Sequence, residues 1–214
     1  MTHPSSTDAL IARLAATPVP GVRFSATRMV AAMGLALLLG FAAQMVVSGL
    51  RPGLAASLAA PVTLAKPLLP LLLLAMAWPM AARLARPGAR AGLWPLALPA
   101  VVAVALAAWA LAATPPDRMV IDWLGHSAAT CVPLILALSV LPMVAGLRAL
   151  RRGAVTRPRL TGALIGLAAG AGATTGYALS CTEDSPLFYV FWYGMAIVLS
   201  TALGAWAGPR ALRW

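Results

Sequence analysis

The 214-residue sequence has few charged side chains and very few acidic ones. Only 10% of its residues are charged, and only five are aspartate or glutamate, whereas soluble domains average about 25% charged residues. The apolar fraction is 61% and the mean hydropathy is +0.88. A chain of this length has too little polar surface to cover a water-soluble globule. We therefore expect an integral membrane protein without a separate soluble domain.

The sequence also lacks the groups that membrane enzymes and transporters use. It contains no Walker loop, HExxH motif or Ser–His–Asp set, and its two histidines, His3 and His126, lie outside the apolar runs. Lys66 is the only charged residue inside a run, and Gln44 is the only strongly polar side chain at depth. Proton relays and substrate pathways need such groups within the membrane. We expect no enzymatic activity.

Six apolar runs are each long enough to cross a bilayer, which takes about 17–25 residues in a helix. They are Met29–Leu50, Val62–Ala82, Leu93–Ala113, Ala128–Leu147, Leu160–Ser180 and Leu187–Ala207. Short linkers with turn residues separate them, and Ser185 and Pro186 suit the N-cap and first position of the last helix. The sequence thus predicts an all-α, polytopic membrane bundle of six transmembrane helices over residues 29–214.

Residues 1–28 form a separate N-terminal segment in this interpretation. They lack a continuous apolar core, so they are not a signal peptide. A serine or threonine would cap a short amphipathic helix over Asp8–Ala16, with Leu10, Ile11 and Leu14 on one side. Such a helix either lies on the lipid surface or docks a cytoplasmic partner.

The basic residues are distributed unevenly between the two sides of the predicted bundle. Thirteen of the sixteen lysines and arginines lie on one side, and four of the five acidic residues lie on the other. The positive-inside rule then places both termini in the cytoplasm. The net charge of +11 is explained by this topology and by attraction to anionic lipid. No aromatic-interleaved basic patch indicates direct binding of nucleic acid.

Glycines recur at every fourth residue of the fifth run, at Gly162, Gly166 and Gly170. Small residues at this interval let two helices approach until their backbones touch. Packing within the chain and homodimerisation both explain such a ladder.

The only two cysteines, Cys131 and Cys181, both fall near the outer ends of predicted neighbouring helices. Facing residues of packed helices can approach the disulfide limit of about 7 Å between Cα atoms, and the outer side of a bacterial inner membrane is oxidising. Two thiolates also suit soft ions such as Cu(I), Cd(II) or Zn(II). A third interpretation is that the cysteines are soft apolar packing residues. Spacing alone does not separate a disulfide from a metal site, and the CxxC motif of thiol oxidoreductases is missing.

Four other side chains are close enough in sequence to complete a transient metal site beside the cysteines: Asp122, His126, Glu183 and Asp184. Asp122 and His126 are four residues apart, so they would share a face if that segment were helical. No resident cofactor is required. A sensor of oxidants or of thiophilic metals fits either chemistry.

Three stretches of the second half carry a resemblance to a known family: RRGAVTRPRLTGALIGLAAG, YALSCTEDSPLFYVFWYG and the terminal GPRALRW. They resemble the NrsF-type integral-membrane anti-sigma factors of proteobacteria, and the first half of the chain matches mainly in layout. The resemblance implies a protein that holds an extracytoplasmic-function (ECF) sigma factor inactive at the inner membrane. It also implies release of that sigma factor under heavy-metal or oxidative stress, with Cys131 and Cys181 as the sensing pair.

The surface that would hold the sigma factor is less well indicated. The chain lacks the HxxxCxxC zinc motif of soluble anti-sigma domains, so another surface must serve. The candidates are Leu10, Ile11 and Leu14 together with the arginine-rich linkers.

Two interpretations from other classes remain open at this point. A small transporter or metal-permeation protein would use the same cysteines, although the scarcity of polar residues along the helices counts against it. A membrane scaffold would carry a fixed structural disulfide between them.

Overall fold

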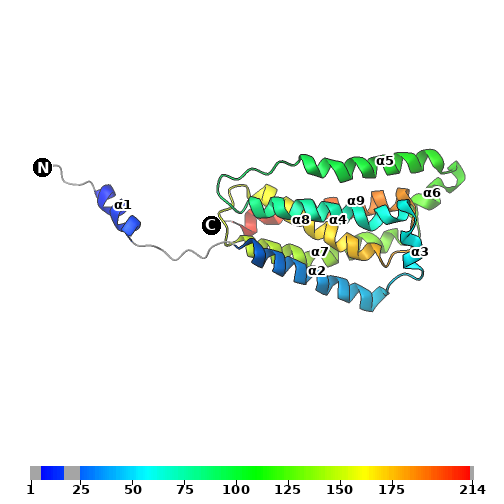
Figure 1. Cartoon of the computed structure of the whole chain (residues 1–214), viewed down its shortest axis with the longest axis horizontal. Coiled ribbons are helices and arrows are strands. Elements are labelled where there is room, and N and C mark those ends of the chain that lie inside the picture. Colours follow the sequence, from blue (N-terminus) through cyan, green and yellow to red (C-terminus); the bar gives the residue numbers. More distant parts are fainter. Residues whose placement is uncertain (1–5, 17–24, 213–214) are drawn as a thin grey trace.

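The computed structural model describes residues 6–16 and 25–212, and over these ranges the protein is all-helical, without a strand. A short helix near the N-terminus stands apart from a bundle of long helices that lie side by side (Figure 1). The helices are α1 (Ser6–Ala16), α2 (Ala26–Ser48), α3 (Leu54–Leu58), α4 (Pro61–Arg83), a 3-10 turn (Trp94–Leu96) leading into α5 (Ala97–Ala113), α6 (Pro116–Leu124), α7 (Ala128–Leu150), α8 (Pro158–Ala178) and α9 (Pro186–Ala211). The all-α prediction is confirmed for the described residues.

Five stretches of the described chain are long and apolar enough to cross a membrane. They are Ala26–Ser48, Pro61–Arg83, Trp94–Ala113, Pro116–Leu150 and Pro186–Ala211. The fifth predicted run, Leu160–Ser180, corresponds to α8, which does not belong to this group. Glycines and threonines make α8 less apolar than its neighbours. A count of six spans therefore stays a prediction.

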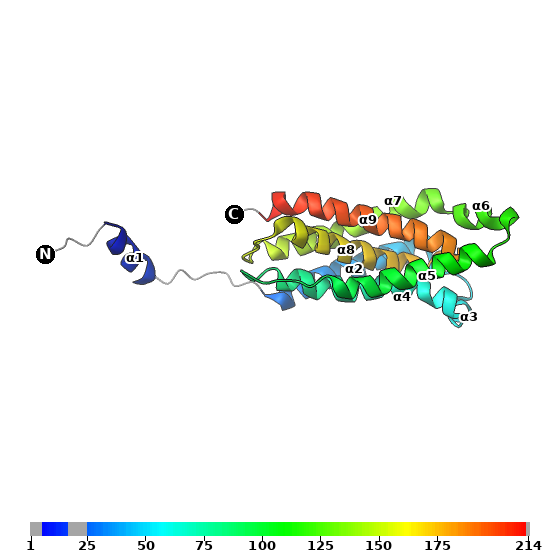
Figure 2. The ribbon, with the colours of Figure 1, turned by 90° about the horizontal axis from the view of Figure 1, so that it is seen from above.

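Helix α8 occupies the centre of the bundle. It packs against α9, α4, α7 and α2, and a second view shows it enclosed among them (Figure 2). Thirteen of its 21 residues are buried, whereas α5, at the edge, buries only Pro99 and Ala110. A helix surrounded by protein can carry small and weakly polar residues, because its surface meets other helices rather than lipid.

The glycine ladder of α8 faces α9. A Cβ atom at Gly162 would overlap the backbone carbonyl of Gly204, and one at Gly166 would overlap that of Ser200. At Gly170 an added Cβ would lie 2.7 Å from the Ser200 Cβ. These close approaches occur within one chain, so the ladder is already occupied and does not offer a free face for a second copy.

The last helix begins as the sequence indicates. Ser185 is the N-cap residue of α9 and Pro186 occupies its first turn. The backbone N–H of Phe188 donates to the Ser185 carbonyl at 3.0 Å. This start fixes the short connection between α8 and α9, residues 179–185, which we call the α8–α9 turn.

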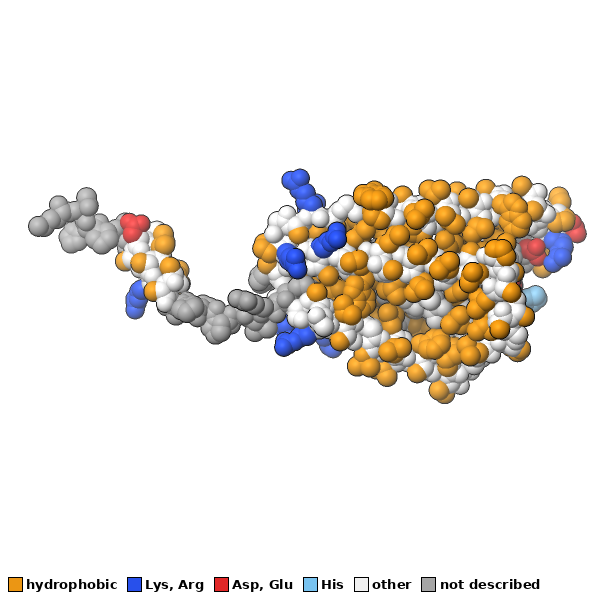
Figure 3. Space-filling view, in the orientation of Figure 1, with side chains coloured by type: hydrophobic (Ala, Val, Ile, Leu, Met, Phe, Trp, Pro, Cys, Tyr) orange, Lys and Arg blue, Asp and Glu red, His pale blue; other side chains and the backbone are white. Residues whose placement is uncertain are grey.

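Charged side chains gather at the two ends of the bundle, with an apolar surface between them (Figure 3). We call one end the arginine end; it comprises Arg28, Arg83, Arg86, Arg90, Arg148, Arg151, Arg152, Arg157, Arg159 and Arg210. The opposite end, which we call the cysteine end, holds the α8–α9 turn, α3 and α6 together with Arg51, Lys66, Arg118 and the acids Asp117, Asp122, Glu183 and Asp184.

Candidate functional site at the cysteine end

The structure brings the two cysteines into one apolar cluster between α7, α8 and α9. Cys131 lies in the first turn of α7 and is fully buried, and Cys181 lies in the α8–α9 turn with 6% of its surface exposed. Both are free thiols. The hydroxyl of Ser127, which precedes α7, is 3.9 Å from the Cys181 sulfur. The two cysteines therefore belong to one cluster, contributed by the first turn of α7 and by the α8–α9 turn.

Aromatic rings wall this site. Phe188, Tyr189 and Tyr193 from the start of α9 are buried in the cysteine cluster, and Tyr177 from α8 joins them. Tyr193 packs edge-on against Tyr177 at 5.8 Å and against Phe188 at 6.3 Å between ring centroids. Apolar walls of this kind exclude water, so a reagent reaches the thiols only when the end of the bundle opens locally.

Lys66 binds the backbone of Cys181. Its amino group donates to the Cys181 carbonyl at 2.6 Å and lies 3.4 Å from the Asp184 carboxylate, while its side chain is 1% exposed. Burial of a lysine is costly unless its amino group has partners. In the sequence, Lys66 is the only charged residue inside an apolar run. An ionisable residue within a membrane span indicates a functional position.

Arg51, in the linker between α2 and α3, makes a second attachment to the same turn. Its guanidinium donates to Asp184 at 2.6 Å and to the Cys181 carbonyl at 3.4 Å, and its backbone N–H donates to Leu179. The hydrogen bond with Asp184 raises the pKa of Arg51 above its ordinary value. Sequence reasoning did not single out Arg51.

The opposite side of the α8–α9 turn is held by the segment before α7. Glu183 accepts a hydrogen bond from the backbone N–H of His126 at 2.8 Å, and the His126 ring nitrogen Nδ1 is 3.5 Å from the same carboxylate. The ring of His126 is 92% exposed. His126 and Glu183 thus meet each other, and the His126 ring faces outward.

Asp122 and His126 would share a face only if the segment between them were one helix, and this condition is not met. Helix α6 ends at Leu124, and Gly125 follows with a φ of +56°, which turns the chain away before His126. Asp122 instead pairs with Arg118 one turn earlier in α6, at 3.4 Å. An added Cβ at Gly125 would lie 2.6 Å from the Phe188 ring, so glycine is required there for two reasons.

The four side chains considered as auxiliary metal ligands do not gather around the thiols. Asp122 is paired with Arg118, and Asp184 is paired with Arg51 and Lys66. Within residues 6–16 and 25–212, no three His, Cys, Asp or Glu side chains form a group that could hold a metal ion. A thiophilic ion would meet the two thiols without a third such ligand in this arrangement.

The interior beside Gln44 offers little space. Both polar atoms of the Gln44 side chain are buried and have no hydrogen-bond partner within the described part of the protein. They border a cavity of about 10 Å³ between α2, α7 and α8. A cavity of this size has room for about one water molecule.

The residues considered for sigma-factor contact lie on α1. The side chains of Leu10, Ile11 and Leu14 are 56%, 59% and 68% exposed. They extend from a helix that stands apart from the bundle (Figure 1), so the bundle does not cover them.

Comparisons with known proteins agree on one family. A family model described as negative regulator of sigma F, NrsF, matches residues 14–214. The chain is 37% identical over 219 aligned residues to the anti-sigma-F factor NrsF of Caulobacter vibrioides, covering 97% of this chain and 99% of that protein. It is 39% identical over 134 residues to the probable anti-sigma-F factor NrsF of Azospira oryzae, a match that spans 62% of this chain and 63% of that protein. No solved structure matches.

Proposed function

Because the chain belongs to the NrsF family of negative regulators of sigma F, we propose that it is an anti-sigma factor that restrains an ECF sigma factor at the bacterial inner membrane. The match over residues 14–214 carries this proposal, together with the five apolar helices that are long enough to cross a membrane. A sigma factor is the partner, and transcription of its target genes is the output. The role is regulatory rather than catalytic.

In this proposal α8 is a sixth span and the arginine end faces the cytoplasm. The length of α8, 21 residues, suffices to cross a bilayer. The gathering of arginines at one end supports the orientation through the positive-inside rule. The sigma factor then meets the arginine end and the exposed Leu10, Ile11 and Leu14 of α1.

Cys131 and Cys181 act as the sensor in this proposal. A two-electron oxidant such as a peroxide would take two electrons from the thiols as their protons are lost and a sulfur–sulfur bond forms. A thiophilic metal ion would instead replace the two protons and bind both sulfurs. Support comes from the placement of both free thiols in one cluster.

Either reaction changes how α7 meets the α8–α9 pair. The backbone of Cys181 is attached to Lys66 and Arg51, and α8 is locked to α9 along the glycine ladder. A movement of Cys181 toward α7 therefore strains its hydrogen bonds with Lys66 and Arg51. Because α8 and α9 are packed closely, they shift together. A tenfold release of the sigma factor needs only about 1.4 kcal/mol of differential stabilisation between the two states.

The sensing step is tested with the double variant Cys131→Ser/Cys181→Ser. Transcription from a sigma-dependent promoter is measured with and without cadmium, copper or a peroxide, and we expect the variant to keep repressing but to lose induction. A matched variant, Ser127→Ala, changes a neighbouring hydroxyl and should stay inducible. An inducible response that survives loss of both thiols would overturn the sensor.

The transporter interpretation predicts metal flux in proteoliposomes that is lost in the same double variant. The cavity of about 10 Å³ beside Gln44 is far too small for a permeation path, so no observation favours it. A fixed structural disulfide is distinguished by non-reducing gels of cells before and after stress. A static bond gives one mobility under both conditions, whereas the sensor gives two.

A further inference from the structure

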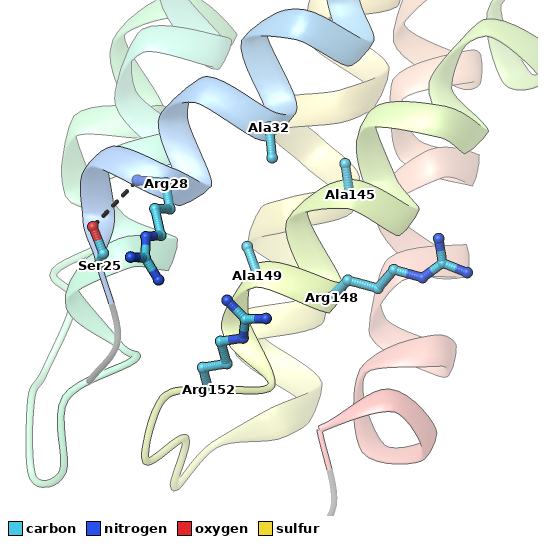
Figure 4. Close-up of a pocket in the computed structure, with 7 residues that line it drawn as sticks. All are labelled: Ser25, Arg28, Ala32, Ala145, Arg148, Ala149 and Arg152. Carbon is cyan, nitrogen blue, oxygen red and sulfur yellow. Dashed lines mark hydrogen bonds between the residues drawn. The ribbon is translucent and has the colours of Figure 1, made fainter. Parts of the chain in front are cut away.

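A pocket of about 300 Å³ opens at the arginine end between the start of α2 and the end of α7 (Figure 4). It is lined by Ser25, Arg28, Ala32, Ala145, Arg148, Ala149 and Arg152. Alanines on both helices keep the gap open, because larger side chains at these positions would fill it. The Ser25 hydroxyl accepts from the backbone N–H of Arg28 at 3.3 Å, which caps α2 at the rim.

The rim of this pocket carries positive charge without a local counter-charge. Arg28 from α2 and Arg152 from the turn after α7 reach into the same gap, and Arg148 extends along the outside of α7 (Figure 4). No carboxylate pairs with any of these three arginines in the part of the chain that the structure describes. Two guanidinium groups facing one gap match the chemistry of a phosphate, whose oxygens accept hydrogen bonds from a guanidinium group in pairs.

The pocket continues into an apolar surface on the side of the bundle. One turn deeper than Ala32, Leu35 is 59% exposed, and one turn deeper than Ala145, Leu141 is 51% exposed. These residues follow the pocket along the same helix faces, since positions three or four apart are neighbours. A ligand in this place would meet arginines at one end and exposed leucines beyond them.

We propose that this pocket binds the phosphate head group of an anionic phospholipid, with an acyl chain lying against α2 and α7. Basic pockets between membrane helices at the cytoplasmic face bind such head groups. A phospholipid would pair its phosphate with the arginines and cover the exposed leucines with an acyl chain, whereas free phosphate would only pair with the arginines. An acidic segment of a soluble partner would reach the arginines but would not cover leucines on the lipid-facing side. The inference is independent of the sensing role of the cysteines.

The test is lipid binding to the purified full-length protein in detergent, measured by native mass spectrometry. Phosphatidylglycerol, phosphatidylcholine and inorganic phosphate are titrated separately. We expect retention of phosphatidylglycerol alone by the unchanged protein and roughly 25-fold weaker binding by Arg28→Gln/Arg152→Gln, because each arginine near anionic lipid contributes roughly a factor of five. Arg86→Gln/Arg90→Gln removes the same charge from the same end outside the pocket and should bind as tightly as the unchanged protein.

Three results would overturn the proposal. The first is equal weakening by both double variants, which would mean that general charge attracts the lipid. The second is displacement of phosphatidylglycerol by an equal concentration of inorganic phosphate. The third is unchanged lipid binding by Arg28→Gln/Arg152→Gln; if repression is lost at the same time, the pocket belongs to the sigma factor instead. If the glutamine variant does not fold, Arg28→Lys/Arg152→Lys keeps both charges and is expected to retain the lipid.

Discussion

At the scale of single residues, Lys66 and Arg51 connect the turn that carries Cys181 to the rest of the bundle. Both cations bind the Cys181 carbonyl, and both lie beside Asp184. They attach the α8–α9 turn to α4 and to the linker between α2 and α3. Any chemistry that moves Cys181 must stretch or rearrange these attachments, so they set how readily the thiol becomes available.

The variant Lys66→Met is therefore expected to expose Cys181. It keeps an unbranched apolar stem but removes the donor at 2.6 Å, which leaves the Cys181 carbonyl with Arg51 at 3.4 Å. A hydrogen bond from a charged donor stabilises a protein by about 1.5 kcal/mol at the lower end of its range. If the closed state of the turn loses about 1.4 kcal/mol, the population with Cys181 accessible rises about tenfold, and the rate of maleimide labelling should rise by the same factor. Labelling is followed in membranes of a Cys131→Ser background.

Arg118→Met provides the matched control, because Arg118 lies at the same end and pairs only with Asp122 in the described residues. Its labelling rate should equal that of the background protein. Equal labelling rates for Lys66→Met and Arg118→Met would mean that Lys66 does not hold the turn.

The position of each cysteine along the bundle could be predicted from the sequence, but the contacts of the side chains at this end could not. Cys131 and Cys181 could be placed at one end because run lengths and turn positions fix where each helix ends. The partner of Lys66 could not be found, because it is a backbone carbonyl 115 residues away. Asp122 and His126 do not share a helix face, because Gly125 adopts a positive φ and the helix ends before His126.

At the scale of elements, α8 owes its central place to its small residues. Its ladder approaches α9 along Gly162, Gly166 and Gly170, and on another face Gly172 lies against Leu37 of α2. The same glycines lower its hydropathy, which is why α8 is absent from the group of five membrane-crossing candidates. Hydropathy identifies helices that face lipid more reliably than helices that other helices enclose.

Gly166→Ala is predicted to destabilise the bundle. Its new Cβ would overlap the Ser200 carbonyl, so α8 and α9 must separate or shift. Overpacking of this kind costs about 1–3 kcal/mol, and we expect a clear fall in the melting temperature of the purified protein. Gly194→Ala adds the same methyl group to α9 where nothing lies within 4 Å, and it should leave the melting temperature nearly unchanged. Equal melting temperatures for the two variants would contradict the packing role.

The boundaries of the long helices were predictable and two short helices were not. Turn residues mark the ends of the apolar runs, and Ser185–Pro186 marks the start of α9. Helices α3 and α6 lie in linkers at the cysteine end, where a run-based reading expects only turns. For α6 a signal existed, because Pro116 and Asp117 in its first turn are typical of helix starts.

At the scale of the whole molecule, the opposite ends have different chemistry and one apolar body joins them. The arginine end offers charge for a partner or for lipid head groups, and the cysteine end offers two sheltered thiols (Figure 3). A difference of this kind between the two ends suits a protein that detects a signal on one side of a membrane and changes its binding of a partner on the other side. The two ends lie on opposite sides of a membrane only if α8 crosses it between α7 and α9.

Labelling at the two ends of α8 tests that arrangement directly. Thr156 precedes α8 and Thr182 follows it, and both are exposed. Thr156→Cys and Thr182→Cys are made singly in a Cys131→Ser/Cys181→Ser background and treated with a membrane-impermeant maleimide in spheroplasts. We expect labelling of Thr182→Cys in intact spheroplasts and of Thr156→Cys only after the membrane is permeabilised, because the proposed orientation follows the positive-inside rule and puts the arginine end in the cytoplasm. Labelling of both positions from one side would show that α8 does not cross. The reverse pattern would place the arginine end outside and remove the cysteine end from the oxidising compartment on which the sensing proposal depends.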